Sequence, residues 1–113
     1  MNKSISMKYR CHCGNIYITF MFSQENKVEK IFAHLGKAGN CHLCILEGVT
    51  RLINLGLPDK LDIDDIIKEL TSLSCNNLVF YKGESIASCV DAIAKAFKKV
   101  ISLSKEEEAK DVK

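Results

Sequence analysis

Cysteines carry most of the chemistry that this sequence offers, and four of the six lie in two short motifs. The first motif is Cys11-His12-Cys13, and the second is Cys41-His42-Leu43-Cys44. Thiolate sulfurs and imidazole nitrogens in such motifs are typical ligands of tetrahedral zinc. A CxxC at the start of a helix offers both sulfurs to one ion, whereas a CxC in a strand holds them about 6–7 Å apart. The spacing therefore predicts either a zinc site of Cys11, Cys13, Cys41 and Cys44, or a small core residue at Cys44 and a loop thiol at Cys11.

The CxxC motif has a second interpretation, thiol–disulfide exchange. At the N-terminus of a helix the dipole favours the thiolate of the first cysteine. A redox role is an alternative to zinc, although the βαβ order of thioredoxin-like proteins is absent from this sequence.

A glycine-rich segment before the same helix could bind an anion. Backbone N–H groups at a helix start bind phosphate, and a lysine in this segment adds positive charge. The segment lacks the terminal Lys-Ser/Thr pair of a Walker loop, and a simple capping turn is the alternative. Residues 85–88 enter the last helix in the same way. The expected ligand is a nucleotide or another phosphate-bearing small molecule, bound by Gly36, Lys37, Ala38, Gly39, Asn40, Ser85 and Ser88.

The elements that must position these residues follow from the apolar spacing. Alternation over 16–22 and again over 28–35 predicts a β-hairpin. Helical spacing follows from Cys41 to Gly56, then from an N-cap at Asp62, and finally from an N-cap at Ser88. A short strand is expected at 78–81. The sequence thus predicts a small α+β domain of order β-β-α-α-β-α, in which a hairpin and a short third strand pack against two or three helices.

Length and composition limit the classes of function. The chain has 113 residues, 47% of them hydrophobic, and its 16 basic and 14 acidic residues leave a net charge of +2. This predicts one soluble domain over 1–104 and a charged, disordered tail over 105–113. The balanced charge gives no strong nucleic-acid signal, and Lys95, Lys98 and Lys99 are typical of a solvated helix face. Neither a signal peptide nor an apolar run of membrane-spanning length is visible, so we expect a cytoplasmic protein with reduced cysteines and no membrane partner.

Three stretches of the chain resemble a known family. They are Cys13-Gly14-Asn15, the run from Leu35 to Cys41, and Ser88-Cys89-Val90-Asp91-Ala92-Ile93-Ala94. Together they resemble the TSCPD domain, which occurs near the C-terminus of adenosylcobalamin-dependent ribonucleotide reductases and as small free-standing proteins. The resemblance covers roughly 13–97. The chain departs from the name-giving motif at Ala87 and Val90, where the family has threonine and proline, and losing that proline should affect pre-organisation of the helix more than the fold.

The resemblance implies a different set of four sulfurs. The recurring cysteines of the family match Cys13, Cys41, Cys75 and Cys89, which come from four separated places. This set could hold a metal such as zinc or form a buried thiol cluster. It shares only Cys13 and Cys41 with the first set, so the two sets cannot both be complete.

The resemblance also implies a function. We expect a free-standing domain that is not catalytic alone, since 113 residues cannot supply the barrel and radical cofactor of a reductase. No carboxylate pair or Ser/His/Asp set stands out, so no catalytic residue is assigned. The domain would bind a nucleotide or serve as an accessory module to a reductase chain. The alternatives are a small structural zinc protein that mediates protein–protein contacts, and a thiol redox protein. A domain of this size with an open-edged sheet is also expected to form a homo-oligomer.

Overall fold

The computed structural model describes residues 3–12, 14–36, 41–57, 60–75 and 78–111, with side chains except those of 41–43 and 104–111. Over these residues the order of elements is β-β-β-α-α-β-β-α. The α+β class is the one that the sequence predicts. The order differs by two strands that the sequence analysis missed, β1 (Lys3–Cys11) and β5 (Glu84–Ile86).

Three antiparallel strands form the main sheet, in the order β1-β2-β3, where β2 is Gly14–Phe22 and β3 is Val28–Leu35. The predicted hairpin is β2–β3, and its register pairs Ile16 with Leu35 and Phe20 with Ile31. These apolar residues share one buried face of the sheet, while Tyr17 and Phe32 on the other face are exposed. The hydrophobic core therefore lies against this buried face of the sheet.

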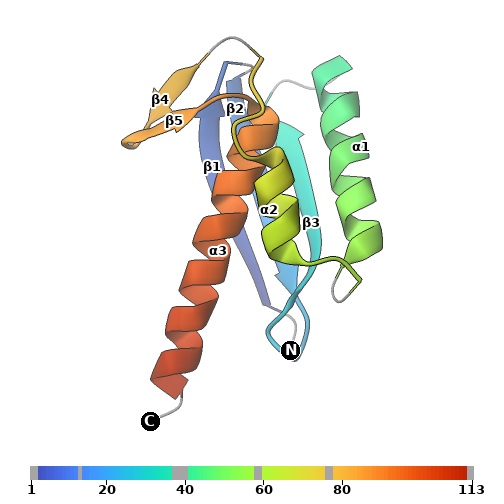
Figure 1. Cartoon of the computed structure of the whole chain (residues 1–113), viewed down its shortest axis with the longest axis vertical. Coiled ribbons are helices and arrows are strands. Elements are labelled where there is room, and N and C mark those ends of the chain that lie inside the picture. Colours follow the sequence, from blue (N-terminus) through green and yellow to red (C-terminus); the bar gives the residue numbers. More distant parts are fainter. Residues whose placement is uncertain (1–2, 13, 37–40, 58–59, 76–77, 112–113) are drawn as a thin grey trace.

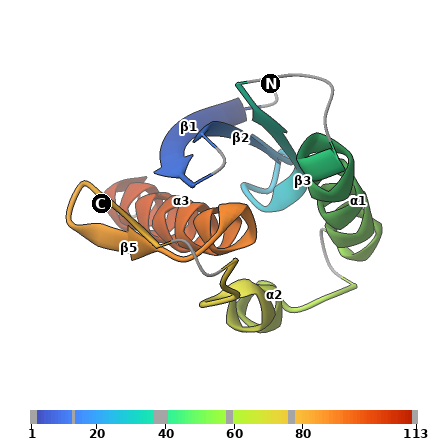
Figure 2. The same ribbon diagram turned by 90° about the horizontal axis from the view of Figure 1, so that it is seen from above.

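Helices cover that buried face (Figures 1 and 2). They are α1 (Cys41–Gly56), α2 (Ile63–Leu70) and α3 (Cys89–Asp111), with N-caps at Asp62 and Ser88 as predicted. The core is centred on α3, whose Phe97 ring meets Phe20 of the sheet edge-to-face at 5.0 Å. The backbone of α3 is helical as far as Asp111, so the tail predicted for 105–113 begins inside this helix. The domain boundary at 104 stays a prediction.

The first helix lies beside the edge strand β3 rather than over the middle of the sheet (Figure 2). Asn54 of α1 uses both ends of its amide on one residue of that strand. Its Oδ1 accepts the Ile31 N–H at 2.8 Å and its Nδ2 donates to the Ile31 carbonyl at 3.0 Å. The side chain thus occupies hydrogen-bonding groups that would otherwise face outward from the sheet edge.

A second, two-stranded sheet stands at one end of the domain. It pairs β4 (Val79–Tyr81) with β5 through a turn at Lys82 and Gly83. Both turn residues have positive φ, 50° and 82°, as a type I′ hairpin requires. The hairpin packs on β1 through Tyr9 and Tyr81, whose ring centroids are 5.9 Å apart. Within the described residues, no helix is long and apolar enough to span a membrane.

Candidate functional site

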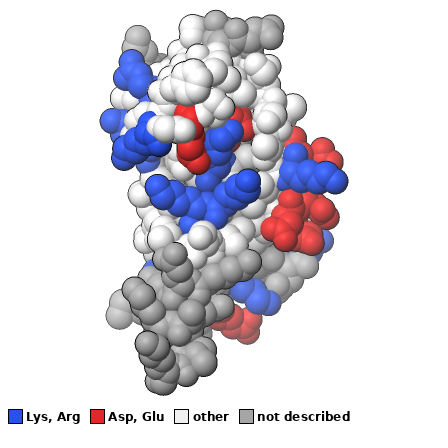
Figure 3. All heavy atoms as spheres, turned by 60° about the vertical axis from the view of Figure 1, so that its left-hand side comes forward, with Lys and Arg blue, Asp and Glu red and all other residues white. Residues whose placement is uncertain are grey.

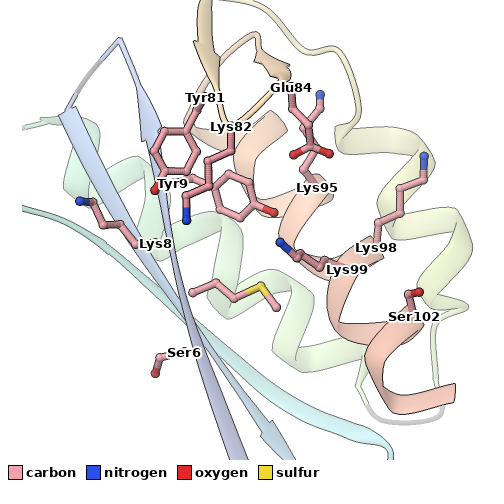
Figure 4. A pocket seen from close by; sticks show the side chains of 11 residues that line it. Ser6, Lys8, Tyr9, Tyr81, Lys82, Glu84, Lys95, Lys98, Lys99 and Ser102 are labelled. Carbon is pink, nitrogen blue, oxygen red and sulfur yellow. The ribbon is translucent and has the colours of Figure 1, made fainter. Parts of the chain in front are cut away.

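A pocket of about 710 Å³ lies where β1, the β4–β5 hairpin and α3 meet (Figure 4). Strand β1 forms one wall, the hairpin closes the end, and one face of α3 forms the opposite wall. A volume of this size is typical of sites for small molecules and cofactors. The pocket is lined by Ser6, Met7, Lys8, Tyr9, Tyr81, Lys82, Glu84, Lys95, Lys98, Lys99 and Ser102.

Lysines dominate this lining. Lys95, Lys98 and Lys99 lie three and four residues apart on α3, so they share one face of the helix. Lys8 comes from β1 and Lys82 from the hairpin turn, and among the lining side chains that the structure describes Glu84 has the one carboxylate. Figure 3 shows basic side chains gathered on one face, with few acidic ones among them. The pocket therefore has a positive potential that favours an anion.

Two tyrosines stand at the hairpin end of the pocket (Figure 4). The Lys82 ammonium lies 5.4 Å from the centroid of the Tyr81 ring, within cation–π range. Burial raises the pKa of the Tyr9 hydroxyl, and Glu84 and Tyr81 raise it further. The Tyr9 hydroxyl therefore stays protonated at neutral pH, where it can donate a hydrogen bond to an anion.

A buried carboxylate holds one of these lysines in place. Asp91 is completely buried and accepts hydrogen bonds from the Ala87 N–H at 2.9 Å, the Ser72 N–H at 2.7 Å and the Lys95 ammonium at 2.5 Å. Burial alone would raise the pKa of Asp91, but the hydrogen bonds from Ala87, Lys95 and Ser72 outweigh it and lower the pKa. Asp91 is therefore ionised at neutral pH, and it anchors Lys95 at the pocket wall.

A protein-family model of the TSCPD domain matches residues 2–101. The chain belongs to the TSCPD domain family. The match confirms the resemblance expected from the sequence and extends over β1, which the three resembling stretches do not include. Among curated proteins and solved structures, none matches the chain.

Of the residues predicted to bind an anion, the three that the structure describes, Gly36, Ser85 and Ser88, do not belong to the pocket lining. Lys37, Ala38, Gly39 and Asn40 fall outside the described residues of the TSCPD domain. The Gly36 N–H donates to the Asn15 carbonyl at 2.9 Å, and Ser85 is exposed in β5. The buried Ser88 hydroxyl donates to the Leu73 carbonyl at 2.5 Å and accepts the Asp91 N–H at 3.1 Å, so it already serves the fold. A ligand at this predicted site stays a prediction.

The predicted metal ligands are described only in part. Cys13 and the side chain of Cys41 fall outside the described residues, and both sets of four cysteines need them. Cys11 is buried, and its Sγ lies 3.5 Å from the Gly14 carbonyl. Cys44 is exposed on α1.

A backbone hydrogen bond fixes the position of Cys75, one of the other two cysteines. The Cys75 N–H donates to the Ala87 carbonyl at 3.1 Å, which brings Cys75 close to the start of α3, where Cys89 is half-buried. Among the described residues, no group of three or more histidine, cysteine, aspartate or glutamate side chains is arranged to hold a metal. Neither four-cysteine set is tested, and zinc stays a prediction.

Reasoning from the sequence missed the lysine pocket. Lys95, Lys98 and Lys99 have the pattern of a solvated helix face, and within α3 alone that interpretation is reasonable. The alternation of Ile5, Met7, Tyr9 and Cys11 could have identified β1, one wall of the pocket, as a strand. The contact between Tyr9 and Tyr81, which folds the hairpin over that strand, has no local signal in the sequence.

Proposed function

We propose that this TSCPD domain is a non-catalytic module that binds a phosphate-bearing small molecule, first of all a nucleotide, in the pocket between β1, the β4–β5 hairpin and α3. The observation that carries the proposal is the convergence of Lys8, Lys82, Lys98 and Lys99 around one pocket of about 710 Å³, to which the Tyr9 hydroxyl and Lys95, paired with Asp91, also belong. Lysine ammonium groups bind phosphate oxygens as mobile point charges, and a protonated phenol adds a directed donor.

The two ends of the pocket suit the two parts of a nucleotide. Lys98 and Lys99, with the Ser102 hydroxyl, would bind the phosphates along α3. The ring of Tyr81, which is half-buried and packs on the buried Tyr9, would offer aromatic surface to the base at the hairpin end. The sequence resemblance supports a nucleotide over other phosphates, because it links the family to reductases that act on nucleotides. A reductase chain as partner is part of the same proposal.

Isothermal titration calorimetry with ATP, inorganic tripolyphosphate and adenosine tests this proposal. We expect ATP and tripolyphosphate to bind, and their affinities to fall as salt is raised, because exposed lysines are screened. In the double variant Lys98→Gln/Lys99→Gln the affinity for ATP should fall roughly tenfold or more, or about 1.4 kcal/mol. The matched control is Lys30→Gln/Lys68→Gln, which removes the same charge from exposed positions outside the pocket.

The outcomes separate the alternatives. Equal losses in the two double variants would show that net charge, rather than the pocket, attracts the anion. Absence of binding by every nucleotide and polyphosphate would refute the proposal. Metal analysis of the same purified protein tests the zinc prediction independently, and the alkylation rate of the cysteines tests the redox prediction.

A further inference from the structure

The outer face of α1 carries an exposed apolar stripe. Ile45, Leu52 and Leu55 are 65%, 68% and 72% exposed, although the helix buries Leu46 and Ile53 on its other side. With Gly48 the stripe has the spacing 45-48-52-55, which is the three–four alternation of positions that face a partner helix in a coiled coil. Exposed aliphatic side chains aligned on one face of a helix in this way are typical of an interaction surface.

Two neighbouring features determine the apolar surface and the charge around the stripe. Leu61, which is half exposed, packs directly on Gly56 at the end of α1, where its side chain fills the space that a Cβ on Gly56 would take. The charged residues beside the stripe, Glu47 and Arg51, form an ion pair within the helix at 3.9 Å. The surface is therefore apolar along its length and neutral at this flank. Figure 1 shows α1 as the outermost element on its side of the domain.

We propose that a second copy of this chain covers the stripe, through antiparallel packing of α1 against α1 of the partner. The stripe is complementary to a second copy of itself. Under a twofold axis that crosses the outer face of α1 at the height of residue 50, Ile45 faces Leu55 of the other copy and Leu52 faces Gly48. A Cβ at Gly48 would meet nothing within 4 Å, so the space above this glycine can take the leucine side chain of the second copy.

The parallel arrangement fits less well. It would set Gly48 against Gly48 and leave a gap at the centre of the contact, and both Leu52 side chains would lie against each other without a hole to enter. In the antiparallel register, Leu52 of each copy packs against Gly48 of the other, so the twofold axis produces this leucine–glycine contact twice. A helix of 16 residues is about 24 Å long, so the contact lies at the small end of stable interfaces. The dimer should therefore dissociate on dilution.

Sedimentation velocity over a wide concentration range tests the proposal. The wild-type chain should pass from monomer to dimer, and Leu52→Glu should raise the dissociation constant at least tenfold. Leu78→Glu is the matched control, because Leu78 is a leucine of similar exposure, 54%, far along the chain from α1. A wild-type chain that is monomeric at every concentration would overturn the proposal, as would equal weakening by the two variants.

The Gly48→Leu variant distinguishes specific packing at this glycine from nonspecific hydrophobic association. The substitution adds apolar surface and should raise the melting temperature, since leucine favours a helix far more than glycine does. Filling the hole should nevertheless weaken the dimer at least tenfold, and a tighter dimer in this variant would contradict the antiparallel fit.

Cross-linking gives the orientation. In a mixture of Ile45→Cys and Leu55→Cys chains, oxidation should join one variant to the other in preference to itself, with the wild-type chain as the control for native cysteines. Preferential self-linking of each variant would refute the antiparallel orientation.

Discussion

Replacing Asp91 should show how much the hydrogen bonds of one buried carboxylate to three segments contribute to the free energy of unfolding. Its oxygens accept hydrogen bonds from the backbone before α3 at Ala87, from the segment after α2 at Ser72, and from the side chain of Lys95. In Asp91→Asn the single amide oxygen can keep one backbone donor, while the amide NH₂ group faces the others. Each lost hydrogen bond to a charged group costs about 1.5–3 kcal/mol, so we expect the free energy of unfolding to fall by about 3 kcal/mol.

The pH dependence of this loss in unfolding free energy is the more specific test. Because the pKa of Asp91 is lowered in the folded protein, the unfolded chain binds the proton more readily. The stabilisation is therefore fully present above the unfolded pKa of about 3.9, and it is lost as the pH falls through the folded pKa. The gap between wild type and Asp91→Asn should be widest near neutral pH and should narrow in acid.

Urea unfolding followed by circular dichroism, from neutral pH down to about pH 3, measures both effects. The matched control is Asp65→Asn, which removes the same charge from an exposed position on α2 and should change stability by less than about 0.5 kcal/mol. A loss below about 1 kcal/mol in Asp91→Asn, or a gap that stays constant with pH, would show that the carboxylate does not act as described.

Two other features of the fold give predictions of their own. Asn54→Ala removes both hydrogen bonds to Ile31. The variant loses the side-chain partner of the Ile31 N–H and carbonyl at the sheet edge. The free energy of unfolding should fall by about 1–3 kcal/mol, and light scattering should show more aggregation than in Gln24→Ala, the control at an exposed position. Gly83→Ala forces a side chain into positive φ in the β4–β5 turn without any steric contact. Urea unfolding should show a loss of about 1 kcal/mol, and no change would mean that the turn relaxes freely.

Local patterns were sufficient for most of the fold. The alternation over β2 and β3 and the caps at Asp62 and Ser88 act over a few residues, and the structure confirms the elements they predict. Strand β1 was missed although Ile5, Met7, Tyr9 and Cys11 alternate with polar residues, because its apolar residues are fewer than those of β2, which has apolar side chains on both faces. The three residues of β5 are too few to show any period.

The pocket could not be predicted because its walls come from opposite ends of the chain. Tyr9 and Tyr81 meet across 72 residues of sequence, and this contact, together with the packing of β1 and β5 on α3, brings Lys8 and Lys82 to the lysines of α3. Each lysine alone has the pattern of a solvated surface residue. Their convergence is a property of the tertiary fold, and residue spacing carries no trace of it.

The lysine pocket and the apolar stripe on α1 lie on opposite sides of the domain. We therefore expect ligand affinity and dimer affinity to be independent of each other. Helix α1 stands on one side, while β1, the β4–β5 hairpin and the basic face of α3 stand on the other (Figures 1 and 2). A dimer formed through α1 therefore leaves both pockets open to solvent. Substitutions at distant sites without shared partners are additive to within about 0.5 kcal/mol, so Leu52→Glu should leave ATP affinity unchanged and Lys98→Gln/Lys99→Gln should leave dimerisation unchanged. Coupling between the two would require a path through the sheet, on which α3 and α1 pack at different strands, or through α2, which packs on α3.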